Sequence, residues 1–106
     1  MTEAETRLAG TISHAELQAL IEQACRQLGH WYYSPADSIR SQAGWVDLVI
    51  LGKRASLFAE MKTEAGRRTM PQIRVAERLQ LCGLRYRLWR PGDWLSGVIQ
   101  GELEQL

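Results

Sequence analysis

The stretch WVDLVILGKRASLFAEMK, residues 45–62, decides the fold of this 106-residue chain. Residues 45–51 and 56–62 are rich in the branched and aromatic side chains that favour β-strands, and the GKRA between them is typical of a tight connection. We therefore expect an antiparallel hairpin. A turn centred in the middle of GKRA places Asp47 directly opposite Glu60.

Asp47, Glu60 and Lys62 form the candidate active site. Directly opposed side chains share a face, with Cβ atoms about 4.5–5.5 Å apart, and Lys62 follows Glu60 by two residues on that same face. Two carboxylates this close repel each other, and a hard divalent cation such as Mg²⁺ or Mn²⁺ would relieve the repulsion. Such a metal could activate water beside a phosphodiester, with the ammonium group stabilising negative charge. The alternative is a surface ion pair beside an edge aspartate, because D…ExK occurs often by chance.

The segments around the hairpin predict one α/β (α+β) domain over residues 13–106, preceded by a flexible leader over residues 1–12. The elements expected on either side of the hairpin are a helix over 14–28, a strand over 30–34, a helix over 70–82, a strand over 84–90 and a helix over 94–105. The order α-β-β-β-α-β-α argues for a mixed central sheet flanked by helices.

Three helix starts carry recognisable caps. Ser13 with Glu16, and Thr69 with Gln72, have the spacing of capping boxes. Asp93 is expected to cap the last helix. Gln72 is therefore a capping residue first, and a role in the site would come in addition.

Composition excludes several classes of protein. The chain is 45% apolar and 24% charged, as an ordinary globular domain is, and no stretch resembles a transmembrane span. Residues 1–10 are polar and acidic, unlike a secretory signal. Cys25 and Cys82 have no CxxC spacing, which favours buried free thiols in a reducing compartment over a disulfide or a zinc site.

The small net charge hides a basic middle. Residues 40–90 hold eleven Lys or Arg and four Asp or Glu, a balance of +7. This suits a phosphate backbone, although solvated surface arginines would explain the charge equally well. Arg40, Arg67 and Arg68 are the candidates for phosphate contacts because they lie in loops near the candidate site.

The hairpin resembles the core of the PD-(D/E)XK nucleases, and its surroundings resemble their VRR-NUC branch, the small phage and prophage nucleases. The segments that carry this second resemblance are DSIRS at 37–41, GRRT with PQ at 66–72 and WRPGDW at 89–94. The resemblance covers about residues 13–95. The ExK core alone is a weak signal, whereas all these blocks in order and at compatible spacing are a strong one.

The resemblance implies a restriction-endonuclease-like fold and metal-dependent cleavage of DNA, often of branched DNA such as Holliday junctions, by a homodimer. It implies that Asp47, Glu60 and the Met61 carbonyl bind Mg²⁺ or Mn²⁺, that Lys62 is the catalytic lysine, and that Gln72 supports the site. It implies no organic cofactor and no membrane association. For a phage or prophage protein the location would be the cytoplasm of a bacterial host.

Two positions depart from the family pattern. Val46 stands where the family usually has proline, with little expected effect on geometry. His14 stands where the family usually has a glutamate at the start of the first helix, and it can still face the site. Imidazole suits Mn²⁺ better than Mg²⁺. Either His14 substitutes, or Glu16 reaches in, or the site has fewer acidic ligands.

The missing acid keeps a second class of function open. The chain could be a catalytically weak or inactive nuclease fold that binds DNA or acts as an interaction module. Trp45, Trp89 and Trp94 are expected to be structural, and residues 31–33 (WYY) to pack in the core or a dimer.

Overall fold

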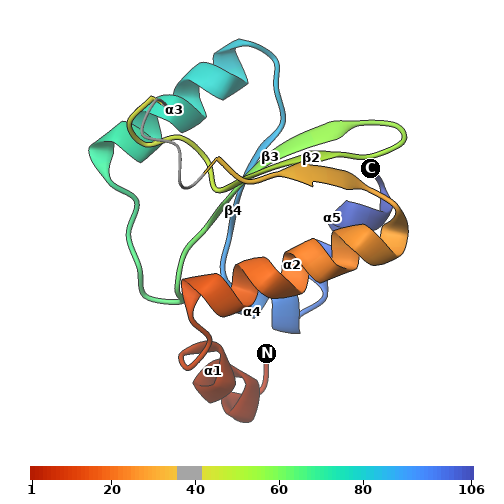
Figure 1. Ribbon diagram of the computed structural model, residues 1–106. Helices are drawn as coiled ribbons and strands as arrows, with labels where there is room; N and C mark the ends of the chain where they lie inside the picture. The colour runs from red at the N-terminus through yellow and green to blue at the C-terminus, as the bar shows by residue number, and fades with distance from the viewer. Residues whose placement is uncertain (36–41) are drawn as a thin grey trace.

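The computed structural model describes residues 1–35 and 42–106 (Figure 1). Its elements, in chain order, are α1 (Glu3–Ala9), α2 (His14–Leu28), β1 (Trp31–Tyr33), β2 (Leu48–Leu51), β3 (Ser56–Met61), α3 (Met70–Leu81), β4 (Tyr86–Trp89), α4 (Pro91–Leu95) and α5 (Val98–Glu104). This confirms the expected order, except that α1 is additional and the last helix is divided in two. None of the helices in the described part of the chain is long and apolar enough to cross a membrane.

The four strands form one mixed sheet in the order β1-β2-β3-β4. β1 pairs antiparallel with β2, and β2 with β3, whereas β4 joins parallel to β3 after the crossover through α3. In the central hairpin Leu48 pairs with Ala59 and Leu51 with Ser56, which is the register expected from a turn centred in GKRA. All the strands are shorter than the sequence suggested.

Helices cover both faces of the sheet (Figure 1). The larger apolar cluster packs α2 and α5 against one face; its sheet members include Leu48, Ile50 and Ala59. The smaller cluster packs α3 against the other face and includes Val46 and Tyr86. This three-layer arrangement confirms the expected fold of a mixed central sheet flanked by helices.

The capping boxes confirm two helix starts and correct a third. Ser13 with Glu16 and Thr69 with Gln72 each form both capping hydrogen bonds. Asp93 is not an N-cap: it lies in the first turn of α4, where its Oδ2 accepts from the Arg90 amide at 2.8 Å. Pro91 takes the first helical position, where its missing N–H is not needed, and so moves the start of the helix ahead of Asp93.

Helix α1 lies within residues 1–12, the segment that we expected to be a flexible leader. The Thr2 side chain accepts from the Glu5 amide at 3.1 Å and caps the helix. Ala9 is fully buried, and α1 contacts α4. The secondary structure of this segment therefore differs from the expectation.

The cysteines are free, as expected, but only one is buried. Burial, with the charge of Glu22 adding, raises the pKa of the Cys25 thiol to about 11. Cys82 lies exposed at the C-cap of α3, so the expectation of two buried thiols is wrong for Cys82.

The turn between β2 and β3 packs against the last residue of the chain. The amides of Arg54 and Ala55 donate to the Leu106 carbonyl oxygen at 2.6 and 3.2 Å. A Cβ added at Gly52 would lie 2.3 Å from that oxygen. Gly52 must therefore be glycine, because the backbone of Leu106 lies too close for a side chain. This contact packs the turn against the residue that follows α5.

We predict that Gly52→Ala lowers the free energy of unfolding by about 1–3 kcal/mol, because the added methyl must displace buried Leu106. The matched control is Gly101→Ala in α5, where a Cβ meets nothing within 4 Å. Alanine should raise stability there by up to about 1 kcal/mol through helix propensity. Urea unfolding measures both, and equal midpoints for the two variants would contradict the packing described.

Candidate functional site

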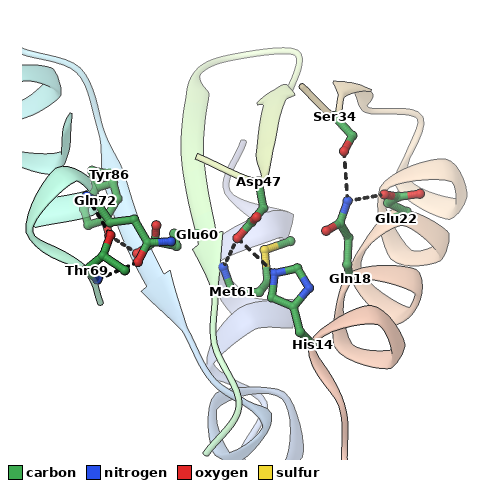
Figure 2. Close-up of polar contacts among 10 residues, drawn as sticks. All are labelled: His14, Gln18, Glu22, Ser34, Asp47, Glu60, Met61, Thr69, Gln72 and Tyr86. Atoms are coloured by element: carbon green, nitrogen blue, oxygen red, sulfur yellow. Dashed lines mark hydrogen bonds and ion pairs between the residues drawn. The ribbon is translucent and has the colours of Figure 1, made fainter. Parts of the chain in front are cut away.

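Asp47 lies just before β2, where the hairpin ladder stops. The last ladder pair is Leu48 with Ala59, and the Asp47 amide donates to the Ala59 carbonyl at 3.1 Å. The Asp47 carboxylate Oδ2 accepts from the Met61 amide at 2.8 Å (Figure 2). The expected direct opposition of Asp47 and Glu60 within the ladder is therefore wrong.

The chain changes face at this point. In a regular strand residues two apart share a face, yet Val46 is buried in the cluster under α3 while Leu48 is buried in the cluster under α2 and α5. The Asp47 side chain consequently turns toward α2, while Glu60 points to the α3 side, as Figure 2 shows. Packing of Val46 overrides the simple alternation.

At Gly44 the backbone that leads to Asp47 packs directly against α3. The φ of Gly44 is +83°, a conformation that favours glycine. A Cβ there would lie 2.3 Å from the Pro71 carbonyl carbon and 2.5 Å from the Gln72 amide nitrogen. The backbone before Asp47 thus rests directly on the first turn of α3.

His14, the first residue of α2, faces Asp47, and the sequence allowed for this orientation. Its Nε2 lies 3.1 Å from Asp47 Oδ2 (Figure 2). The hydrogen bond to Asp47 raises the pKa of His14; burial and the Lys62 charge oppose the rise, and the Glu60 charge adds to it. A histidine with a carboxylate partner therefore occupies the place expected for an acid.

The two glutamates of α2, Glu16 and Glu22, contact groups other than Asp47. The Glu16 carboxylate accepts from the Ser13 amide at 3.4 Å within the capping box. The Glu22 carboxylate accepts from Gln18, whose amide group also donates to the Ser34 hydroxyl. Of the alternatives for the first-helix position, His14 is the residue that contacts Asp47.

Glu60 is an almost fully buried carboxylate with 1% exposure. The Tyr86 hydroxyl donates to its Oε2 at 3.2 Å. Burial chiefly raises the pKa of Glu60, and the charge of Asp47 adds to it, against the Tyr86 hydrogen bond and the charges of Lys62 and Arg68. Placing a charge here costs free energy that the described residues offset only in part.

Tyr86 is a site neighbour that sequence reasoning missed. It comes from β4, and burial, with the charge of Glu60 adding, raises its pKa to about 12, so that it remains a neutral hydrogen-bond donor. β4 runs parallel to β3, with Glu60 paired with Leu88, so Tyr86 lies two residues along on the same face. The only sequence signal is the apolar alternation of this strand, which does not say which strand it joins.

Lys62 directly follows β3, and its amide donates to the Trp89 carbonyl at 3.0 Å. Arg90 holds the next loop: its Nη1 donates to the carbonyls of Gly66, Thr63 and Glu64 at 2.6, 2.8 and 3.3 Å. The loop thereby brings Arg68 close enough to influence Glu60 and Tyr86.

The remaining predicted site residues have mixed outcomes. Gln72 accepts from the Thr69 amide at 2.8 Å as a capping residue, and its role in the site stays a prediction. Arg67 is exposed in the loop after Lys62. Arg40 lies outside the described residues.

The donor chemistry of this cluster suits a hard divalent cation. Asp47 and Glu60 supply carboxylate oxygens, and the raised pKa of Glu60 means that its charged form is disfavoured by burial, which a bound cation would offset. Within residues 1–35 and 42–106, however, no three His, Cys, Asp or Glu side chains are grouped closely enough to hold a metal by themselves. A metal would therefore need a backbone oxygen or water in addition to the two carboxylates.

The sequence matches no protein-family model, and no curated protein is similar to it. A solved structure described as a "VRR_NUC domain" is similar in fold, with a TM-score of 0.68 and 21% sequence identity over 82% of this chain and 94% of that one. The chain therefore has the fold of a VRR_NUC domain, which is the fold that the sequence blocks led us to expect.

We predict that Asp47→Asn lowers the pKa of His14 toward its ordinary value, because the main cause of the upward shift is lost. NMR titration of the ring protons in EDTA measures this. The ring resonances of the other histidine, His30, whose Nε2 contacts the Leu103 carbonyl oxygen, serve as the internal reference.

The same contact makes the free energy of unfolding depend on pH. The His14–Asp47 contact contributes fully below about pH 6.5, and the contribution is lost as pH rises through the folded-state pKa. A His14 pKa that is the same in both proteins would contradict the contact.

Proposed function

We propose that the chain is a Mg²⁺- or Mn²⁺-dependent nuclease that hydrolyses DNA phosphodiester bonds. The observation that carries the proposal is the buried Glu60 carboxylate, whose pKa is raised beside Asp47 and Lys62 in a VRR_NUC fold. Folding normally avoids such an arrangement unless function requires it. A divalent cation and a phosphate group would account for the two carboxylates and the lysine together.

In this proposal Asp47, Glu60 and the Met61 carbonyl hold the metal, which would polarise the phosphoryl oxygen and lower the pKa of a bound water. Lys62 stabilises the negative charge that develops on the phosphate. His14 holds the Asp47 carboxylate in position through the 3.1 Å contact, and Gln72 supports the site from α3.

Positive charge next to these residues supports a nucleic-acid substrate. Arg67 and Arg68 lie in the loop that follows Lys62, and Arg40 is a further phosphate-contact candidate from the sequence. We propose branched DNA, such as a four-way junction, as the substrate and a homodimer as the active form. Two copies related by a twofold axis would present two sites to two strands, and a strictly monomeric mass with and without DNA would contradict this.

A catalytically weak or inactive DNA-binding or interaction module is the second candidate. One observation favours it: a histidine, not a carboxylate, meets Asp47 from α2. Imidazole is a poor ligand for Mg²⁺, so a site of this composition could retain binding and lose turnover.

We expect cleavage of supercoiled plasmid and of a labelled four-way junction with Mg²⁺ or Mn²⁺. Asp47→Ala and Lys62→Ala should each lower the rate by about 10²-fold or more, because the first removes a proposed metal ligand and the second removes positive charge at the reacting phosphate. Lys53→Ala, which removes a lysine from the exposed hairpin turn, is the matched control and should cleave normally. Junction binding without cleavage by the unsubstituted protein in either metal would establish the second candidate instead.

We also predict that Glu60→Gln raises the free energy of unfolding at pH 7.5 in EDTA by on the order of 1 kcal/mol. The melting temperature should rise accordingly. Because the folded-state pKa of Glu60 is raised, its contribution is favourable below about pH 4.5 and is lost as pH rises through that pKa. The difference between the two proteins should therefore vanish in acid.

Added Mn²⁺ should stabilise the unsubstituted protein and have much less effect on Glu60→Gln, since the variant loses a metal ligand. Glu104→Gln, at an exposed position of α5, is the control and should behave like the unsubstituted protein. Equal stabilisation of all three proteins by Mn²⁺ would argue against a metal at Glu60.

A further inference from the structure

A groove of about 660 Å³ lies beside the candidate site, on the α3 side of the sheet. Its walls are the segment that leads to Asp47 and one flank of α3, with Trp45, Pro71, Arg74, Val75, Arg78 and Leu79 as the main lining residues. We call it the Trp45 groove. It is distinct from the Glu60 and Lys62 cluster, and its size is that of sites that hold small organic ligands.

Trp45 forms an aromatic wall of this groove. We expected Trp45 to be structural, and one side of it is: its ring packs edge-to-face on Phe58, with centroids 6.3 Å apart and planes at 90°. The residue nevertheless remains partly exposed and lines the groove. A ring that is already held by Phe58 loses little conformational entropy when a second flat group stacks on it.

Arg74 and Arg78 give the groove its charge. They lie one turn apart on α3, about 6 Å along the helix axis, and both are exposed. Among the described residues no Asp or Glu lines the groove, and neither arginine forms an ion pair. Two guanidinium groups beside an aromatic wall suit a ligand with successive anionic groups and a flat ring.

We propose that the Trp45 groove binds an unpaired nucleotide of single-stranded DNA, with its base on Trp45 and the adjoining phosphates on Arg74 and Arg78. Stacking on aromatic side chains combined with a basic groove is how single strands are bound without sequence preference. A continuous duplex does not fit this description, because its bases remain stacked on their neighbours.

The groove is linked to the candidate site through the backbone. Trp45 precedes Asp47 by two residues, and the intervening backbone is anchored where Gly44 meets Pro71 and Gln72. An unpaired nucleotide held here would position an adjoining phosphodiester near the carboxylates. The inference thus rests on the proposed function for its choice of DNA, and it adds that unpaired nucleotides next to the cut are what the protein selects.

The test measures binding of a fluorescein-labelled single-stranded oligonucleotide by anisotropy in EDTA, where no metal-dependent cleavage occurs, against a blunt duplex of equal length. The paired variant Arg74→Ala/Arg78→Ala should raise the Kd for the single strand about tenfold or more. It should also reduce the slope of log affinity against log salt by about 1.4, since each phosphate contact on a single strand contributes about 0.7.

The matched control is Lys53→Ala/Arg54→Ala, which removes the same charge from the hairpin turn. It should leave the single-strand Kd within about twofold of the unsubstituted value. Trp45→Leu should weaken single-strand binding on the order of tenfold with no change in salt slope, because stacking carries no charge. If Trp45→Leu does not fold, the Arg74→Ala/Arg78→Ala variant alone tests the proposal. It should fold, because both arginines are exposed on α3 and alanine is a strong helix former.

Equal weakening by the groove pair and the control pair would overturn the inference, and so would equal or tighter binding of the duplex by the unsubstituted protein. The outcome is separable from that of the proposed function. If the protein cleaves duplex plasmid normally and Arg74→Ala/Arg78→Ala does not change the Kd for the single strand, the groove proposal fails and the nuclease proposal stands. Groove-dependent single-strand binding with no cleavage in any metal would remove the nuclease and leave the groove.

Discussion

The antiparallel pairing of β2 with β3 positions both apolar clusters and the candidate site. Its register puts Leu48 and Ala59 toward α2 and α5, and Val49 and Phe58 toward α3. Because side chains alternate, a slip by one residue would exchange the two faces and expose both clusters. The same pairing ends where the Met61 amide donates to the Asp47 carboxylate, so the candidate site begins where the hairpin of the core ends.

Burial of the Glu60 carboxylate disfavours its charged form. Glu60 is buried with a neutral partner, Tyr86, and its nearest positive charges only partly offset its desolvation. Asp47 is better stabilised, by the Met61 amide and by His14. The two carboxylates therefore face opposite helices and have different partners. That asymmetry is what a metal and its substrate would have to bridge.

Much of the fold was predictable because its signals are local. The capping boxes of α2 and α3 each join residues three apart, and the hairpin register follows from a four-residue connection. The division of the last helix was missed, since the break comes at Gly97 with a φ of +83° inside an otherwise helical pattern. The helix at the N-terminus was missed for a different reason: it has a single buried residue, Ala9, and it packs against α4, which is distant in the sequence.

The candidate site was only partly predictable from the sequence. The sequence alone indicated that Asp47, Glu60 and Lys62 lie near the end of one hairpin, because they are close along the chain and the strand register follows from the four-residue connection. It also indicated that His14 could face them. Only the tertiary structure decided that Asp47 turns toward α2, because Val46 is drawn under α3, more than twenty residues away in the chain. It alone brought Tyr86 to Glu60 and Trp45 to Arg74, since contacts between distant segments depend on how whole layers pack.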